Sequence, residues 1–426
     1  MYNEYLKALN KPFRKLAKIE FLNPDGTVAF ALDNQRRKFG KQSSAFIQSG
    51  SLNVSMNNGQ RRKATITLAN LDGEFDYNVN NLWFGQQIRL SMGLVLPNGK
   101  EFYLPQMVGE IATPSFAFTP SMKTATFPLV DKWARLDGTL GGILPAHHRV
   151  ENGADIFDAI SQLLKLSIFN YTSETDDIAL QVDNILPIFT QYYNDKFYQN
   201  SQGDSGTSGT LSYLNTPYTI ESPTGTTLAQ LILDLNACLV GFIGYDATGA
   251  LRLDASQDDV DDSQKPVMWH FTPKNSILCA VNESVQNTKV YNDVLICGQG
   301  LTGYEVWGRA QNVDAKSDTN IFRIGQRTYY ESRAEYWNSQ QCADLATYLL
   351  KRKTVLQKSV DITCGQMFHL IENNLITVER VDKAGAPVER HLINSFTIPI
   401  GETGNMTINA ISVNDIPQFK TIVSQN

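Results

Sequence analysis

The chain has 426 residues, of which 42% are hydrophobic and 10% aromatic, so it can bury the cores of about two to four domains. Only 19% of the residues are charged and the net charge is −6, which argues against a dedicated nucleic-acid binder, because such a protein needs basic surfaces. DNA that slides past without being held remains compatible with this composition.

The spacing of the cysteines and the sequence of the N-terminus indicate in which cellular compartment the chain folds. The first 18 residues mix charged and single apolar side chains, which predicts no signal peptide. No window approaches the roughly 20 apolar residues of a membrane-spanning helix, so we expect no membrane insertion. The cysteines are odd in number and widely spaced, which predicts buried thiols in a reducing cytosol: Cys238, Cys279, Cys297, Cys342 and Cys364.

Short alternating segments dominate the first third of the chain. Residues 15–21 and 28–32 flank Asn23-Pro24-Asp25-Gly26, which predicts a strand, a tight turn and a second strand. Residues 63–68 alternate apolar and polar side chains, which is typical of a half-buried antiparallel strand. Further strands are predicted at 51–56, 87–92, 107–111 and 123–130, and so many short strands favour a barrel or sandwich.

The middle third has a different pattern. Apolar residues at helical spacing predict amphipathic helices over 153–166 and 226–240. The second helix leads into a predicted hairpin, 241–253, with its turn at Ala247-Thr248-Gly249. Residues 194–210 are polar and rich in Gly and Ser, which predicts a mobile surface loop that is dispensable for folding.

The last third returns to strands around one long helix. The helix is predicted over 333–353, with Lys351-Arg352-Lys353 at the end where cations complement the helix dipole. Strands are predicted at 294–297, 359–363, 375–381, 391–400 and 405–413. The whole chain is therefore predicted to be mainly β with α, of the α+β class.

Three stretches, taken in order, resemble the hub proteins at the tip of phage tails and the related hubs of secretion machines. The first is 64–93, a strand followed by Leu71-Asp72-Gly73-Glu74-Phe75-Asp76, then Leu82, Gly85 and another strand. The second is 226–253, a helix feeding a hairpin with Asp-x-x-Gly at its tip. The third is 291–298, followed by the helix 333–353 and the closing strands. The order of the elements carries the resemblance more than any single motif.

The resemblance implies a definite architecture: two similar tube-like β-barrels in each chain, and three chains in a ring of six barrels. We therefore expect residues 1–135 to form a first β-barrel domain and 136–275 a lateral mixed α/β domain that contains the loop 194–210. Residues 276–426 are expected to form the second β-barrel domain, with the helix 333–353. No appended lysozyme or peptidase domain is expected, because Asn426 directly follows the closing strands.

The resemblance also implies a role and partners. The chain is expected to be a structural virion protein of the tail tip, a baseplate hub subunit assembled in the host cytoplasm as a homotrimer around the DNA channel. Its expected partners are a tail tube or distal tail protein, a tape measure protein, and tail spike or fibre proteins. DNA is expected to pass during ejection without specific binding.

Two alternatives stay open beside the structural role. A host-binding tail-tip module would use aromatic side chains beside the polar loop, namely Tyr192, Tyr193, Phe197 and Tyr198. A tail-associated enzyme acting on the cell wall would need two carboxylates facing one cleft, and no signature in the sequence supports such a pair. We expect no enzymatic activity.

We predict no catalytic, cofactor-binding or metal-binding residue, after weighing several motifs. Gly298-Gln299-Gly300-Leu301-Thr302-Gly303 is a GxGxxG, but a strand-like segment follows it in place of the helix that a dinucleotide site needs, so a turn or hairpin is favoured. Cys364 and His369 are too loosely placed to favour a nucleophile and its base, and a structural cysteine is the preferred interpretation. The five histidines lack ligand spacing for zinc: His147, His148, His270, His369 and His391.

Clusters of charge complete the candidates. Asp258-Asp259 and Asp261-Asp262 are conceivable calcium ligands, but a solvated acidic loop is favoured. Arg36-Arg37-Lys38 and Arg61-Arg62-Lys63 are expected to face subunit boundaries or outer partners, paired with acidic residues of a neighbour. The lumen of the expected ring should then carry no continuous basic stripe, because arginine or lysine bound to phosphate would slow the DNA.

Overall fold

The structure is a computed structural model of the 426-residue chain. It describes all residues except 24–25, 39–40, 43, 77–84, 121, 166–179, 183–215, 217–218, 239–241, 255–265, 273–276, 286, 300–303, 334–338, 357, 380–387, 402 and 414–418. The described chain is mainly β with a few helices, so the predicted α+β class is confirmed.

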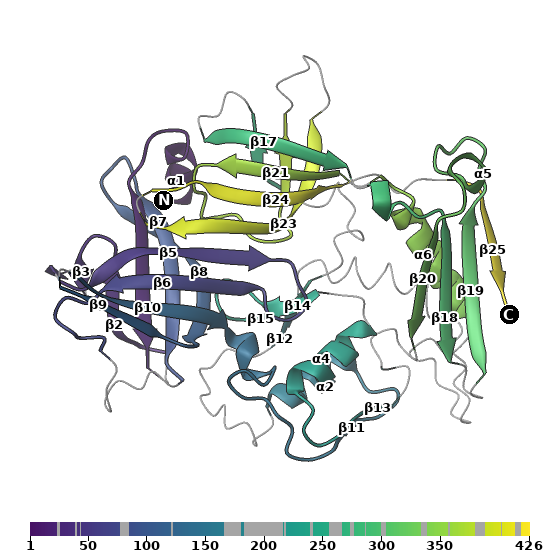
Figure 1. Ribbon diagram of the computed structural model, residues 1–426, viewed down its shortest axis with the longest axis horizontal. Coiled ribbons are helices and arrows are strands. Elements are labelled where there is room, and N and C mark those ends of the chain that lie inside the picture. Colours follow the sequence, from purple (N-terminus) through teal and green to yellow (C-terminus); the bar gives the residue numbers. More distant parts are fainter. Residues whose placement is uncertain are drawn as a thin grey trace.

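One large sheet combines strands from the first and last thirds of the chain (Figure 1). Its first part is antiparallel wherever the described strands pair, and some of its strands, such as β6 and β10, bury alternate side chains over much of their length. In β6, for example, Ala64, Ile66 and Leu68 are buried. The strands of this part are β1 (Lys15–Leu22), β2 (Val28–Asp33), β3 (Arg37–Lys38), β4 (Lys41–Gln42), β5 (Phe46–Ser55), β6 (Arg62–Ala69), β7 (Gln87–Val95), β8 (Glu101–Ile111), β9 (Ser115–Thr119) and β10 (Met122–Asp131).

The second part of the same sheet comes from the last third. Strand β23 pairs with β5 in antiparallel register, from Ser395 opposite Ser55 to Ile400 opposite Gly50. Apolar side chains of both parts form one core, which includes Phe127 from the first third and Ile362 from the last. The strands of this part are β16 (Val267–Phe271), β17 (Leu278–Val285), β21 (Lys358–Cys364), β22 (Leu375–Val378), β23 (Glu389–Ile400) and β24 (Met406–Ser412).

The N-terminus is fastened to this core by a short helix that the sequence did not predict, α1 (Tyr2–Ala8). Tyr5 is fully buried, and its hydroxyl accepts a hydrogen bond from the Phe368 amide at 2.8 Å. The same hydroxyl lies 3.1 Å from Nδ1 of His369. The first and last thirds are thus joined by side chains as well as by strand pairing.

The middle of the chain forms a second core. The helices begin where polar caps end the preceding segment: Asp155 accepts from the Asp158 amide at 2.9 Å, and Thr227 from the Gln230 amide at 3.1 Å. Both predicted helices are therefore confirmed, with shorter bounds. The elements are η1 (Lys132–Arg135), β11 (His148–Val150), α2 (Ile156–Leu164), β12 (Leu180–Val182), β13 (Ile220–Ser222), α4 (Leu228–Ala237), β14 (Phe242–Tyr245) and β15 (Leu251–Asp254).

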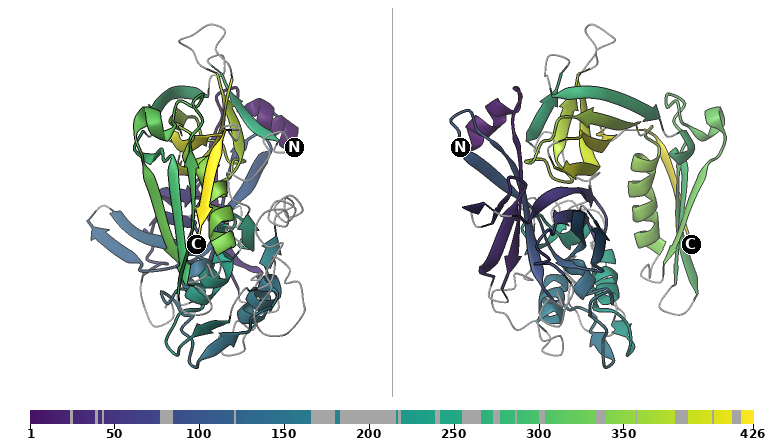
Figure 2. Two further views of the ribbon diagram at one scale, coloured as in Figure 1. Left: turned by 90° about the vertical axis from the view of Figure 1, so that its right-hand side faces the viewer. Right: turned by 60° about the vertical axis from the view of Figure 1, so that its left-hand side comes forward.

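A third core lies in a smaller sheet, ordered β20-β18-β19-β25, with helix α6 packed on one face. Figure 2 shows α6 on the side of this sheet that faces the rest of the chain. Gly308 allows the close approach, because a Cβ there would lie 2.1 Å from the Ala343 amide nitrogen. The elements are η3 (Asn287–Lys289), β18 (Asp293–Gln299), β19 (Glu305–Asn312), α5 (Ile321–Ile324), β20 (Thr328–Arg333), α6 (Ser339–Lys353) and β25 (Thr421–Gln425).

The long helix of the last third begins later than predicted. The helix predicted over 333–353 is α6, and it begins only at Ser339, since Arg333 ends strand β20, which pairs in parallel with β18. The division into domains 1–135, 136–275 and 276–426, with two tube-like barrels, stays a prediction. The loop 194–210 lies outside the described residues.

Candidate functional site

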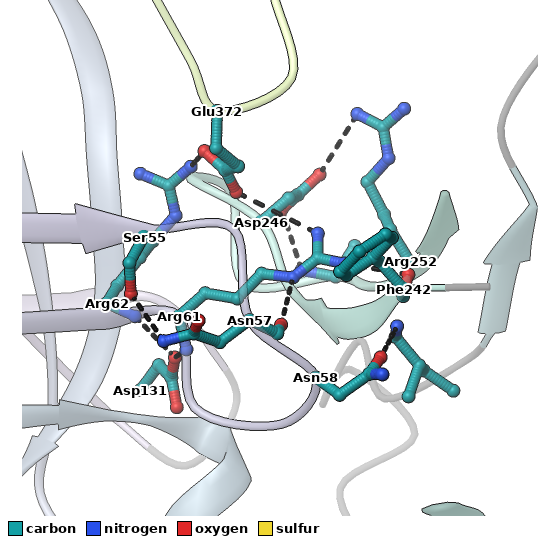
Figure 3. Close-up of polar contacts among 12 residues, drawn as sticks. Ser55, Asn57, Asn58, Arg61, Arg62, Asp131, Phe242, Asp246, Arg252 and Glu372 are labelled. Atoms are coloured by element: carbon teal, nitrogen blue, oxygen red, sulfur yellow. Dashed lines mark hydrogen bonds and ion pairs between the residues drawn. The ribbon is translucent and has the colours of Figure 1, made fainter. Parts of the chain in front are cut away.

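The loop between β5 and β6 reaches the middle part of the chain, and buried charged and polar side chains contact one another around it (Figure 3). Its turn is Asn57-Asn58-Gly59. Asn58 Oδ1 accepts from the Ile243 amide at 2.8 Å, and the Gly59 amide donates to the Ile243 carbonyl at 2.8 Å. Gly59 has φ +92, a conformation that favours glycine. The loop therefore docks on β14 through backbone-like pairing.

Arg61 extends this docking from the end of the loop. Its guanidinium donates to the Phe242 carbonyl at 2.7 Å and to the Asn57 carbonyl at 3.2 Å, and it lies 3.9 Å from the Glu372 carboxylate. Gly244 leaves the space for it, because a Cβ at that position would lie 2.5 Å from Arg61 Nε. Arg61 is only 2% exposed, so its charge is held inside the protein.

Arg62, the first residue of β6, turns toward the last third of the chain. Its guanidinium donates to the Gln106 carbonyl at 2.9 Å and forms an ion pair with Glu372. The side chains of Arg62 and Glu372 are 1% and 5% exposed. Gln106 continues the contact, since its amide group donates to the Phe368 carbonyl at 2.8 Å.

Asp131 completes the set from the end of β10. One carboxylate oxygen accepts from the amides of Arg61 and Arg62, both at 2.8 Å, and the other accepts from the Trp133 amide at 3.2 Å. Burial raises the pKa of this carboxyl to about 6, although the three amide hydrogen bonds and the Arg62 charge favour the ionised form. Asp131 thereby fixes the start of β6 and caps η1.

Together, Arg61, Arg62, Asp131 and Glu372 form what we call the arginine junction. It ties the first third of the chain to the middle through Phe242, and to the last third through Glu372. Removing one partner of a buried ion pair leaves the other charge buried without compensation, which costs about 3–5 kcal/mol. The arrangement is suited to fixing the relative positions of these parts.

The junction corrects the prediction for Arg61-Arg62-Lys63. Arg61 and Arg62 are buried and pair with Glu372 of the same chain, so they do not face a neighbouring subunit. The prediction was wrong because a basic run near a turn gives no sign of a carboxylate 310 residues away along the chain. Lys63, by contrast, is exposed.

The other basic run, Arg36-Arg37-Lys38, also finds partners within the chain. Arg37 donates to Asp33 at 2.6 Å and to Glu101 at 2.8 Å, and both carboxylates raise the pKa of Arg37 against the effect of burial. Arg36 is exposed and lies over the Phe46 ring, 4.7 Å from its centroid. The expected acidic partner is therefore intramolecular for Arg37.

The GxGxxG motif belongs to a hairpin. Gly298 and Gln299 end β18, residues 300–303 lie outside the described chain, and β19 begins at Glu305. The two strands are antiparallel, with Gln299 opposite Glu305. The hairpin interpretation is confirmed, since a strand and not a helix follows the motif.

The remaining candidates are dispersed. Cys364 is buried in β21, and Nδ1 of His369 contacts Tyr5, with burial lowering the His369 pKa to about 4. The aspartates 258–262 and the aromatic residues 192–198 lie outside the described chain. Among the residues that the structure describes, no group of three or more His, Cys, Asp or Glu is placed to hold a metal ion. No helix in that part of the chain is long and apolar enough to cross a membrane.

Comparison with known proteins identifies the fold. No family model and no curated protein matches the chain. A tail protein from Neisseria meningitidis MC58 superimposes with a TM-score of 0.58 at 9% identity, covering 95% of this chain and 98% of that one. The 43 kDa tail protein of prophage MuSo2 from Shewanella oneidensis gives a TM-score of 0.53 at 12% identity, with 94% and 98% covered. The chain has the fold of phage tail proteins.

A chain of a protein complex has a similar fold. A chain of the half-lidded Francisella PdpA-VgrG complex is similar with a TM-score of 0.50 at 10% identity, covering 98% of this chain and 62% of that one. The resemblance to phage tail hubs that the element order indicated is therefore confirmed at the level of the fold. The arginine junction lies within this fold, where it joins β5, β6 and β10 to β14 and to the segment before β22.

Glu372 and Asp131 were missed by sequence reasoning. Glu372 sits in a segment with no charge pattern of its own, and only the fold brings it to Arg62. Asp131 left a weak local signal, because it follows the apolar end of a predicted strand and precedes Lys132-Trp133, as a cap does. Neither position could be paired with the arginines from spacing alone.

Proposed function

We propose that the chain is a structural subunit of a phage tail, a hub at the tail tip of which three copies form a ring around the DNA channel. The observation that carries this proposal is the similarity to tail proteins over nearly the full length of both chains. A match restricted to one barrel or sheet would support only a shared module. A match over all parts supports a shared arrangement of those parts.

The arginine junction supports a structural role. A ring subunit must hold its parts at fixed angles, because an error in one copy is repeated in every copy. The junction does so with two buried arginines: Arg61 donates to the Phe242 carbonyl of the middle part and lies 3.9 Å from Glu372, and Arg62 forms an ion pair with Glu372 of the last third. These groups are buried, so the same residues are poorly suited to contact a substrate.

The proposal extends to the partners. As a hub the chain would contact a tail tube or distal tail protein on one side, a tape measure protein, and spike or fibre proteins at the tip. DNA would pass through the ring without specific binding, which the net charge of −6 supports. The protein would reside in the tail of the virion after assembly in the host cytoplasm, and it would act without catalysis.

Native mass spectrometry of the purified chain over a dilution series tests the proposal. We expect a species of three times the 47.6 kDa chain mass, with dimers appearing only on dilution. A monomer at every concentration, or a hexamer, contradicts the threefold ring. Release of soluble fragments from purified cell wall by the intact protein would contradict the non-enzymatic role and favour the cell-wall-acting alternative.

A further inference from the structure

Helix α1 is fastened by one buried pair of side chains, Tyr5 on the helix and His369 in the segment before β22. Tyr5 is fully buried, and the centres of the two rings lie 5.6 Å apart. Phe102 lies against the Tyr5 ring at 5.2 Å, and Trp269 lies against the His369 ring at 5.6 Å, again between ring centres. The contact between Tyr5 and His369 is therefore largely removed from water.

The Tyr5 hydroxyl fixes the proton on the His369 ring. Its oxygen accepts from the Phe368 amide at 2.8 Å and faces the His369 amide as a second donor, so both of its lone pairs are occupied. The hydroxyl proton then goes to Nδ1 of His369, 3.1 Å away, because this nitrogen is an acceptor in the neutral ring. The arrangement therefore requires a neutral His369 that carries its own proton on Nε2.

A second proton on the ring breaks this arrangement. The new Nδ1–H would be a third donor aimed at an oxygen that has two lone pairs, and the Tyr5 hydroxyl would lose the acceptor for its own proton. Both groups are buried, so water does not replace the lost partners. The docked helix therefore selects the neutral form of His369.

Among the residues that the structure describes, no carboxylate pairs with the His369 ring to compensate a positive charge. On α1, its titratable neighbours are Tyr5 and Tyr2, whose ring centre lies 6.4 Å away. On β16, His270 bonds a threonine hydroxyl of β22 at 2.5 Å. In the segment of His369 itself, Glu372 forms its ion pair with Arg62.

We propose that α1 is a proton-sensitive latch, docked while the His369 ring is neutral and released when Nδ1 takes a proton. Release exposes the Tyr5 ring and unfastens the N-terminus from the last third of the chain. This inference is independent of the proposed function, because it rests on contacts within one chain.

The direction of the pH dependence follows from the two states of the ring. Burial lowers the pKa of His369 in the docked state to about 4, against the smaller opposing effect of the Met268 carbonyl. In the released state the ring is hydrated, and its pKa returns to the ordinary value of about 6.5. Docking is therefore at full strength above pH 6.5 and weakens as the pH falls to 4. The ratio of docked to released α1 should fall by about a hundredfold between pH 7 and pH 4.

Hydrogen exchange of the N-terminal amides tests the latch, with each rate divided by the intrinsic rate at the same pH. The Tyr5 and Leu9 amides donate to the carbonyls of Met1 and Tyr5, and their protection should fall about sevenfold between pH 6 and pH 5. The amides of β6 should keep their protection over this range, which separates release of α1 from unfolding of the whole chain. Protection of α1 that is the same at pH 7 and pH 4 overturns the proposal.

A histidine variant shows whether His369 takes the proton. His369→Asn carries an acceptor in place of Nδ1 and does not titrate, so the protection of α1 should no longer depend on pH. His391→Asn is the matched control, because His391 is also buried with its pKa lowered to about 4, but it lies on β23 beside Glu389. That variant should keep the sevenfold fall. A pH dependence that persists in His369→Asn, or one that vanishes in His391→Asn, contradicts the latch.

Tyr5→Phe decides the matter if His369→Asn does not fold. It removes the hydroxyl alone and leaves Nδ1 buried without its donor, so the protection of α1 at pH 7 should fall about tenfold. Unchanged protection at pH 7 would show that the hydroxyl does not hold α1, and the latch would then be excluded.

Discussion

Arg62 and Glu372 form an ion pair inside the protein although 310 residues separate them along the chain. Arg62 begins a strand of the first third, and Glu372 precedes a strand of the last third. The ion pair can form only when these two parts of the chain are packed together.

Replacing Glu372 should weaken the protein strongly. Glu372→Ala leaves Arg62 buried without its carboxylate, and we expect a loss of about 3–5 kcal/mol in the free energy of unfolding, measured with urea. Glu151→Ala is the control, because it removes an exposed ion pair with Arg149 and should cost no more than about 1 kcal/mol. Equal losses in the two variants would show that the junction does not hold the parts together.

Asp131 should give the stability a specific pH dependence. Burial raises its pKa in the folded chain from 3.8 to about 6, so the folded state favours the protonated carboxyl. The stability from this group is complete below pH 4 and is lost as the pH rises through 6, by about 3 kcal/mol in total. Asp131→Asn removes the titration.

The difference in unfolding free energy between the unsubstituted chain and Asp131→Asn should therefore fall from pH 4 to pH 7 and then stay constant. Urea unfolding at several pH values measures it. Subtracting the two curves cancels the contributions of other carboxyls, such as Asp293, whose pKa is lowered by Arg309 despite the opposing effect of burial. Parallel curves would mean that Asp131 has an ordinary pKa in the folded chain.

Gly308 should be intolerant of a side chain. In Gly308→Ala the new Cβ would meet the backbone of α6, 2.1 Å from the Ala343 nitrogen, so helix and sheet must separate. We expect a loss of about 1–3 kcal/mol and faster hydrogen exchange of the α6 amides. Ser424→Ala, an exposed change in β25 of the same sheet, should leave the exchange unchanged. If the α6 amides exchange as slowly in Gly308→Ala as in the unsubstituted chain, the close packing of α6 on the sheet is contradicted.

Asn292 should control the order of the segment 313–327, which carries α5. Asn292→Ala removes three hydrogen bonds to the loop backbone, and we expect a local loss of about 1–3 kcal/mol. Hydrogen exchange of residues 319–327 measures it. Asn98→Ala, at an exposed turn, is the control. Equal exchange in both variants would show that the loop keeps its conformation without Asn292.

The sequence predicted local structure well wherever apolar side chains recur at regular spacing or a capping residue marks the end of an element. The helix at 226–240 and the turn at Ala247-Thr248-Gly249 follow from apolar spacing and from Asp246, whose carboxylate accepts from the Thr248 amide at 2.8 Å. Helix α1 was missed because its burial depends on Tyr5 reaching Phe368, a contact across the whole chain.

Long-range pairing escaped prediction for a physical reason. The strand pairing of β5 with β23 and the ion pair of Arg62 with Glu372 depend on the three-dimensional arrangement, and neither leaves a local pattern. A basic run on the surface and one that pairs internally have the same sequence, so Arg61 and Arg62 were assigned to a subunit boundary that they do not occupy.

Cryo-electron microscopy of intact tails that contain this chain tests the central claim most directly. The proposed function predicts three copies at the tail tip, arranged as a closed ring around the channel. Density for the chain that is absent from the tip, or present in six copies or one, would contradict the claim.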